Sequence, residues 1–577
     1  MESLKMAGPR EHFLISNHLF TARRTLAWTW LASGLLLAGI AQGADFYAAP
    51  NGTTDGDGSI ERPWNLGKAL KGSEVVQPGD TIWLRGGVYR AYNRPSKYFS
   101  SLQGAENQPI TVRGFPGERA IIDGNLSQLT GGWVNYWGFE IMNSLKRRVT
   151  PEGGPFPKAF WAPDGRGQTT DLTVSGFDLR APQVKLINMI IRDSIGGGIG
   201  INAAAVNPEI YGTLSFHNGW QGGDRGHGHG LYGQSISPSV PQVRDSLFFS
   251  NYALGIQTSG TGPVVDNFQF EGNVVFFNSA ISRQHQANIV VGSASGQARN
   301  ISLVRNFFFE TEPSGTDVNL GYIGGIQNGL VQENYFATKV FFSPNNQNVQ
   351  VNNNITVDAN APGQQPNLVV VRPNQYEAGR AHIIVYNWEG LPEVTVDPSN
   401  ALAAGTAYEI RNAQDILGPP ITQGVYAGGT VTLPMTGLPV AKTFQKNATA
   451  STAPRFNVFV LLPQSNTGVS TNTPPMLSGI TDKTTLQNKP KAGIRFRVRD
   501  AELLPDFLNI SVSSSNTELV PHENIKFTGN GLSRTMKIIP AKDQVGTTII
   551  NLSLSDGLLS TNTTFKLTVN PAVAATP

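Results

Sequence analysis

Short runs of apolar residues, each bounded by glycine, asparagine or proline, recur between residues 180 and 360. The runs are rich in Val, Ile and Phe, and no long stretch shows the 3.6-residue period of an amphipathic helix. Six of the runs carry Asn or Asp at matching places: Asn188, Asp245, Asn273, Asn306, Asn334 and Asn354. The longest interval between successive positions, from Asn188 to Asp245, is divided by Gly212. The intervals are then about 20 to 33 residues, a typical coil length for a solenoid. The pattern predicts a right-handed parallel β-helix with columns of buried aliphatic side chains and Asn ladders at its turns.

After residue 375 the pattern changes to alternating strands with turns between them, which predicts antiparallel β-sandwiches. The predicted fold class is therefore all-β: a right-handed parallel β-helix followed by two small β-sandwich domains. The Asp556-Gly557 pair is a hairpin turn signal in the last of them. The predicted parts are a β-helix over 44–375, a sandwich over 376–463, a linker over 464–475, a second sandwich over 476–571 and a tail over 572–577.

Composition excludes several classes of protein. The 577 residues include no Cys, so a disulfide scaffold, cysteine catalysis and cysteine-ligated zinc are excluded. At this length one compact core is not expected, in keeping with a repetitive fold and additional domains. The 44 Lys and Arg nearly balance the 41 Asp and Glu, so net charge gives no sign of a nucleic-acid partner, and we expect none.

The N-terminus predicts export. Arg23 and Arg24 precede an apolar run over 26–40, which is short for a membrane span and is followed by small residues up to Gly43. We interpret 1–43 as a signal peptide cleaved after Gly43, with a retained anchor as the alternative. The mature chain is expected to be secreted, periplasmic or attached to the cell surface, to be monomeric, and to have no segment inserted in a membrane.

The segment from residue 44 to 124 carries specific motifs. Phe46 and Tyr47 precede Asn51-Gly52, Pro63-Trp64 precedes a short predicted helix over 64–70, and 79–90 reads GDTIWLRGGVYR. These motifs resemble the first coils of secreted bacterial β-helix proteins of the pectate-lyase-like superfamily, including the chondroitinase and alginate-lyase types. The resemblance extends over roughly 44–370, and 476–571 resembles cadherin-like or immunoglobulin-like modules.

Physical reasoning about the same segment predicts its local structure. Pro78-Gly79-Asp80 forms a turn, Ile82 and Leu84 point into the bore, and Gly86-Gly87 makes the next corner. The helix over 64–70 covers the open end of the coil stack, which otherwise exposes an unpaired strand edge.

Histidines are concentrated at one place. Three of the eight, His217, His227 and His229, fall within thirteen residues, and the last two lie in a glycine-rich run over 223–234. One interpretation is a metal site and another is proton transfer near neutral pH. A third is structural: if Ile201, Leu231, Ile256 and Ile289 form one inward column, His229 has the parity of a core residue.

The coil alignment also pairs two R-x-H motifs. It places Arg225 and His227 two coils before Arg283 and His285, with Tyr252 between them. Stacking predicts that the two histidines lie roughly 10 Å apart in one column. Such a strip suits a uronic acid, because arginine binds a carboxylate through two hydrogen bonds. A polar ladder at a solvated corner is the alternative.

The residue types favour β-elimination over hydrolysis. Glycoside hydrolysis usually needs two carboxylates, and only Asp224 stands beside the basic strip. β-Elimination needs a cation for the uronate carboxylate, a base and a proton donor. We assign these roles to Arg225 or Arg283, to His227 or His285, and to Tyr232 or Tyr252. The resemblance implies a Lys/Arg pair and calcium carboxylates, which this sequence does not match residue by residue.

The predicted function is cleavage of an acidic, uronate-containing polysaccharide, with that polymer as the partner. One alternative is a β-helix glycoside hydrolase that uses Asp224, and another is an inert glycan-binding or matrix protein. The sequence identifies no cofactor other than a candidate Ca²⁺. Candidate Ca²⁺ ligands are Asn51, Asp55 and Asp57, or the loop carboxylates Glu310, Glu312 and Asp317, with solvated polar turns as the alternative.

Overall fold

The computed structural model describes residues 43–572. Its gaps are 73–74, 91–95, 145–174, 222–224, 260–264, 283–286, 295, 312–316, 362, 364, 445–448, 450, 465–471, 502 and 504. The signal peptide predicted over 1–43 lies outside the described residues except for Gly43, and so does most of the predicted linker. Among the described residues, none of the helices is long and apolar enough to cross a membrane.

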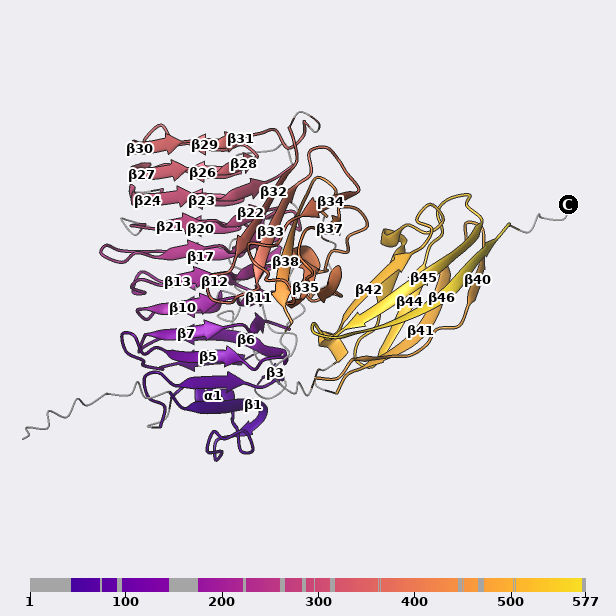
Figure 1. Cartoon of the computed structure of the whole chain (residues 1–577), viewed down its shortest axis with the longest axis horizontal. Helices are drawn as coiled ribbons and strands as arrows, with labels where there is room; N and C mark the ends of the chain where they lie inside the picture. Colours follow the sequence, from indigo (N-terminus) through magenta and orange to yellow (C-terminus); the bar gives the residue numbers. More distant parts are fainter. Residues whose placement is uncertain are drawn as a thin grey trace, which may run out of the picture. The chain divides into compact units, whose positions relative to one another are not determined.

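Three parallel ladders of strands form the β-helix and confirm the predicted fold class (Figure 1). Ladder 1 contains β1 (Asp45–Thr53), β2 (Thr81–Leu84), β5 (Ile110–Gly114), β7 (Val134–Trp137), β10 (Val184–Ile187), β13 (Glu209–Tyr211), β18 (Gln242–Arg244), β21 (Gln269–Glu271), β24 (Ala298–Val304), β27 (Ile326–Gln332) and β30 (Gln347–Asn352). Each coil crosses from ladder 1 to ladder 2 and then to ladder 3, and parallel crossovers of this kind are right-handed in nearly all proteins.

Ladder 2 contains β3 (Gly87–Tyr89), the first half of β6 (Ala120–Gln128), β8 (Glu140–Met142), β11 (Ile190–Arg192), β14 (Leu214–Phe216), β19 (Leu247–Phe249), β22 (Val274–Phe276), β25 (Phe307–Phe309), β28 (Tyr335–Ala337) and β31 (Ile355–Thr356). Ladder 3 contains β4 (Ser96–Ser100), the second half of β6, β9 (Ser175–Leu179), β12 (Gly197–Ile201), β17 (Leu231–Gly233), β20 (Ile256–Thr258), β23 (Ile289–Val291), β26 (Val318–Leu320) and β29 (Val340–Phe342).

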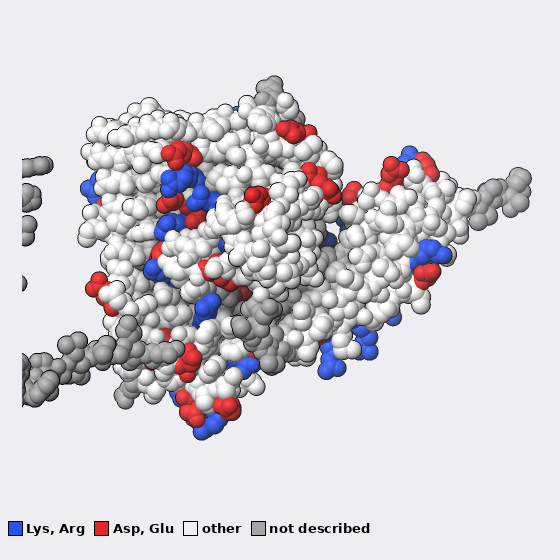
Figure 2. All heavy atoms as spheres, viewed as in Figure 1, with Lys and Arg blue, Asp and Glu red and all other residues white. Residues whose placement is uncertain are grey.

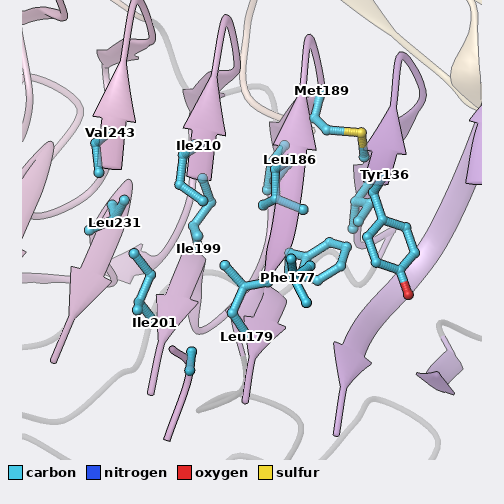
Figure 3. Packing of buried hydrophobic residues seen from close by; sticks show 14 of the residues in the cluster. Tyr136, Phe177, Leu179, Leu186, Met189, Ile199, Ile201, Ile210, Leu231 and Val243 are labelled. Atoms are coloured by element: carbon cyan, nitrogen blue, oxygen red, sulfur yellow. The ribbon is translucent and has the colours of Figure 1, made fainter. Parts of the chain in front are cut away.

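Aliphatic and aromatic side chains from all three ladders fill the bore. Figure 3 shows side chains of ladders 1 and 3 packed between the strands. Leu231, Ile256 and Ile289 stack in one inward column, as predicted. The preceding member is Ile199, so the prediction of Ile201 was wrong by two residues. Both isoleucines face the bore because they are two apart on one strand, and sequence parity therefore does not distinguish them.

The N-terminal end of the coil stack is covered as predicted. The helix is short, α1 (Leu66–Ala69), with Asn65 as its N-cap. Trp64, Leu66 and Ala69 are buried in the same core as Ile82 and Leu84 of β2. The turn before β2 is closed by Asp80, which accepts a hydrogen bond from the backbone N–H of Gln77.

The turn from ladder 1 to ladder 2 is short and carries an Asn ladder. The Asn306 amide donates to Asn334 Oδ1 at 3.0 Å and accepts from the Asn273 amide at 3.0 Å, and Asn334 continues the ladder to Asn354. These four predicted ladder positions are confirmed. Asn188 and Asp245 were misplaced by one residue: they precede the ladder, at positions with φ of 51° and 46°. The ladder position of the Asp245 coil is Ser246, whose N–H donates to Asn273 Oδ1.

A second buried Asn ladder lies at the turn from ladder 2 to ladder 3. The amide side chains of Asn218, Asn251 and Asn278 each donate to the next member, ending at Asn288, over 2.9 to 3.0 Å. The residues before Asn218, Asn251 and Asn278 again have a positive φ, as at His217 and Ser250. This ladder was not among the predicted features, although Asn and a preceding residue suited to a turn recur there.

The middle module begins earlier than residue 375, because β32 already pairs antiparallel with β33. It contains β32 (Leu368–Pro373), β33 (Ala381–Tyr386), β34 (Glu393–Val396), β35 (Ala407–Asn412), η2 (Ala413–Asp415), β36 (Thr422–Val425), β37 (Val431–Pro434) and β38 (Phe456–Pro463). Aromatic residues of β33 and β38 pack with Phe249, Phe276 and Phe309 on the outer side of ladder 2. The module therefore covers the outer face of ladder 2. In the described part of the chain it does not cover the outer face of ladder 3, which we consider as a candidate site.

The C-terminal module is a sandwich of two four-stranded sheets. It contains β39 (Met476–Leu477), β40 (Lys483–Leu486), β41 (Lys491–Arg499), η3 (Pro505–Phe507), β42 (Asn509–Ser514), η4 (His522–Asn524), β43 (Ile525–Thr528), β44 (Ser533–Ile538), β45 (Gly546–Ser555) and β46 (Ser560–Asn570). The predicted turn at Asp556-Gly557 joins β45 to β46, with Gly557 at φ 97°. A cadherin-like or immunoglobulin-like relationship stays a prediction.

Candidate active site on ladder 3

An inserted hairpin precedes β17 of ladder 3. It consists of β15 (Trp220–Gln221) and β16 (Gly226–His227), which pair antiparallel. Before the hairpin, Asn218 is aligned with Asn251, an offset of 33 residues, and after it Leu231 is aligned with Ile256, an offset of 25. The difference of eight residues corresponds to 220–227. The R-x-H motif at Arg225 is therefore an insertion in the coil and not part of its regular ladder.

Glycines hold the hairpin against the coil. Gly228 has φ 88°, and a Cβ there would lie 2.4 Å from the Cα of Gly219. A Cβ on Gly226 would lie 1.7 Å from the carbonyl oxygen of Tyr252. Only glycine fits at such close approaches, so these residues place Arg225 and His227 tightly beside the next coil.

His227 lies against an aromatic ring. Its imidazole stacks on Trp220 with ring centroids 5.0 Å apart and an interplanar angle of 15°. His227 is 6% exposed and Arg225 is half-buried. Trp220 is itself buried, so it supports the imidazole and does not offer a free face to a sugar.

His229 lies outside the bore, contrary to its core parity. Its ring stacks on Tyr232 with ring centroids 6.0 Å apart. Leu254, at the corresponding position of the next coil, packs in a small cluster with Val290 that is separate from the bore. The turn over 228–230 interrupts the alternation that the parity assumed. The Nδ1 atom accepts a hydrogen bond from the backbone N–H of Leu254 at 3.2 Å.

The surroundings of His229 keep its imidazole neutral. Burial lowers its pKa to about 3, and the positive charge of Arg225 and the neighbouring His227 contribute, while a hydrogen bond with Gln257 opposes them. An imidazole with so low a pKa is a weak base near neutral pH. His229 therefore suits a positioning role better than proton abstraction.

Tyr232 belongs to the outer face of ladder 3. Its register neighbours are Gly200 on β12 and Gln257 on β20. The hydroxyl donates to the carbonyl of Ser259 at 3.0 Å. Beyond Gly200 the same column reaches Asp178, which is paired with Arg180. Glycine at position 200 leaves the half-buried phenol without a neighbouring side chain on that strand.

The predicted catalytic residues divide into three groups. Arg225, His227, His229 and Tyr232 lie together, from the hairpin to β17. Tyr252 is fully buried at 0% exposure, so the prediction that it bridges two histidines on an outer surface was wrong. The cause is the register: the column that passes Ser250 contains His217, not Arg225. Asp224, Arg283 and His285 lie outside the described residues.

A strip of charges that the sequence pattern did not predict lies on ladder 1. Lys185, Glu209, Arg244, Glu271 and Arg305 alternate in sign along successive coils, and Figure 2 shows positive and negative side chains side by side on the β-helix. Tyr376, from the loop after β32, donates to Glu209 and accepts from Lys185. Each of these cations faces a carboxylate, so the strip neutralises itself. Opposite charges one coil apart were the signal that sequence reasoning overlooked.

Three of the residues considered for calcium, Asp57, Glu310 and Asp317, make other contacts. Asp57 accepts from Ser59 N–H and pairs with Arg62, as in a polar turn. The Glu310 carboxylate accepts from Thr311 N–H, and Asp317 accepts from the Thr338 hydroxyl. Glu312 lies outside the described residues. Within the described part of the chain no three His, Asp or Glu side chains group as metal ligands, so these residues do not fit the implied calcium site and we assign it no step.

Comparison with known proteins gives a local sequence match and likenesses to solved structures. No family model matches the chain. The chain is 34% identical over 95 residues to pectate lyase PEL9 of Emericella nidulans, which is 16% of this chain and 22% of the relative. The chain thus spans about a fifth of that relative's length.

Among solved structures, pectate lyase Pel9A is similar over 56% of this chain and 83% of its own, with 16% identity and a TM-score of 0.33. A rhamnogalacturonan lyase is similar over 56% of this chain and 91% of its own, with 15% identity and a TM-score of 0.37. Likenesses of this size show neither the activity nor the active residues of this chain.

Proposed function

We propose that the protein is a polysaccharide lyase that cleaves a uronate-containing polymer by β-elimination at the hairpin site of ladder 3. The observation that carries this proposal is the gathering of one arginine, two imidazoles and one phenol from Arg225, directly before β16, to Tyr232 on β17. The local identity to a pectate lyase supports the same reaction class. The proposal includes export of the chain, which the N-terminal sequence suggests.

Each group has a chemical task. The Arg225 guanidinium binds the uronate carboxylate and stabilises the negative charge that develops when the C5 proton leaves. The His227 imidazole removes that proton, and the electron pair forms the C4=C5 double bond as the bond from C4 to the glycosidic oxygen breaks. The Tyr232 hydroxyl, now bonded to the Ser259 carbonyl, donates its proton to the leaving oxygen.

His229 positions these groups. Its Nδ1 is fixed by Leu254, and its ring stacks on Tyr232. A neutral imidazole beside Arg225 leaves the positive charge concentrated on the guanidinium, where the carboxylate binds.

The test is a panel of uronate-containing polymers, with two readouts for each. A lyase produces the ultraviolet absorbance of an unsaturated uronide together with new reducing ends. A hydrolase gives reducing ends without that absorbance, and a binding protein gives neither, so either result contradicts the proposal.

The site is tested separately with Arg225→Gln, His227→Ala and Tyr232→Phe. His522→Ala, in the C-terminal module, is the matched control for histidine removal. Lyase activity that survives all three site variants would place the chemistry elsewhere.

A further inference from the structure

The last coil of the β-helix leaves its bore open. Leu320 on β26 is 1% exposed, whereas its register neighbour Phe342 on β29 is 37% exposed. Val331 on β27 is 2% exposed, whereas its neighbour Val351 on β30 is 51% exposed. These side chains continue the core columns and are uncovered only because no further coil follows. At the other end α1 covers the first coil.

The backbone edge at this end is open too. In the described part of the chain, β29, β30 and β31 pair only with the strands of the preceding coil, β26, β27 and β28. An unpaired edge attracts another strand, and proteins usually protect edges with charged side chains. Residues 340–356 contain no Asp, Glu, Lys or Arg, and this end of the stack, at the top left of Figure 2, is largely white.

The sequence of the edge strand matches itself in reverse. Residues 348–352 read Asn-Val-Gln-Val-Asn in both directions. Asn348 has φ 53°, so regular pairing begins at Val349. In an antiparallel pair, directly opposite residues point to the same side of the sheet. Centred on Gln350, such a pair sets Val349 opposite the partner's Val351 on the bore side, and Gln350 opposite the partner's Gln350 on the outer side.

We propose that the open end is the docking surface for a second copy of this chain, through antiparallel pairing of β30 with itself about a two-fold axis. A two-fold axis uses the same surface on both copies. Because the edge carries no charge, the two copies do not repel one another, and apolar bore residues meet apolar bore residues. Since the other end is covered by α1, the assembly closes as a dimer and does not grow further. This proposal replaces the monomer that the sequence suggested and is independent of the proposed lyase activity.

The test measures the molar mass of the mature chain by light scattering and sedimentation over a wide range of protein concentration. We expect twice the chain mass at high concentration, reversible on dilution. A chain that stays monomeric throughout, or that forms open-ended polymers, overturns the proposal.

Charged variants at Gln350 test the register. Gln350→Lys places two like charges opposite each other, and Gln350→Glu does the same with the opposite sign, so each alone should lose the dimer. Mixing the two variants should restore it as a heterodimer. Gln423→Lys, on the exposed edge strand β36, is the matched control and should dimerise like the wild type. Dimers that persist in Gln350→Lys, or mixtures that stay monomeric, contradict pairing through β30.

Discussion

The two turns that carry the buried Asn ladders begin alike and end differently. Both start with a residue at positive φ followed by a ladder position, as at Arg305 and Asn306 in one turn and at His217 and Asn218 in the other. The first turn then enters the next strand at once. The second carries insertions of varied length before ladder 3, and one of them is the hairpin that carries Arg225 and His227.

This difference indicates that the two turns have different tasks. A turn that repeats without insertion fixes the register of the stack through buried side-chain hydrogen bonds. A turn that tolerates insertions supplies side chains for chemistry, because added residues project outward without disturbing the strands. Changes in the first turn should therefore reduce stability, and changes in the second should reduce activity.

Removing the hairpin should have the largest effect. A chain lacking 220–227, with Gly219 joined directly to Gly228, should keep its fold, because these two glycines already lie in contact. Lyase activity should be abolished, since the deletion removes Arg225 and His227. Circular dichroism and thermal unfolding check the fold, and uronide absorbance checks the activity. A folded deletion variant with full activity would contradict the assignment of the site.

Replacing only the cation should have the next largest effect. Arg225→Gln should lower kcat/KM by about a hundredfold or more, because the substrate carboxylate loses the charge that stabilises its deprotonated form. Arg225→Lys should recover part of this loss, since it keeps the charge but loses the two-pronged geometry. Arg305→Gln, a paired arginine on ladder 1, should leave activity unchanged. Equal losses in Arg225→Gln and Arg305→Gln would indicate a general structural effect.

The second turn also makes stability depend on pH. Burial lowers the pKa of His217 to about 4, so in acid the unfolded chain binds a proton that the folded chain does not. Stability should therefore fall as pH decreases from about 6.5 to 4, by on the order of 3 kcal/mol from this residue. His217→Asn suits the positive φ of 57° and should flatten this part of the profile. Urea unfolding at several pH values measures it, and an unchanged profile would assign the acid sensitivity to other groups.

Sequence patterns predicted the regular part of the molecule well. The ladder from Asn273 to Asn354, the bore residues Ile82 and Leu84, and the helix near Trp64 follow from local periodicity and turn chemistry, which repeat from coil to coil. The predicted column that placed Tyr252 beside Arg225 was wrong for a physical reason. Eight inserted residues change the register within a single turn. The sequence of one coil does not reveal that its alignment with the next coil differs before and after the insertion.

The ladder of the first turn should be sensitive to single substitutions. Asn306→Ala removes an amide that donates to the carbonyls of Phe270 and Val304, and leaves the N–H of Asn273 without its acceptor. Buried polar groups left without a partner cost about 1 to 3 kcal/mol each, so a loss of roughly 2 kcal/mol is expected. Denaturant unfolding checks this value. Asn306→Asp, which turns an acceptor oxygen toward the carbonyls of Phe270 and Val304 and buries a charge at neutral pH, should destabilise the chain at least as much as Asn306→Ala.

The smallest effect should come from a third Asn ladder, on the surface of ladder 1. Asn300 donates to Asn267 at 2.9 Å and accepts from Asn328 at 3.4 Å, but these side chains are exposed, so water replaces each bond that is lost. Asn300→Gly keeps the positive φ of 55° and should cost only about 0.5 kcal/mol. Comparing it with Asn306→Ala contrasts an exposed ladder position, bonded only to side-chain amides, with a buried one that also bonds the backbone. Equal losses at the two positions would mean that ladder geometry, and not exclusion of water, makes the first turn rigid.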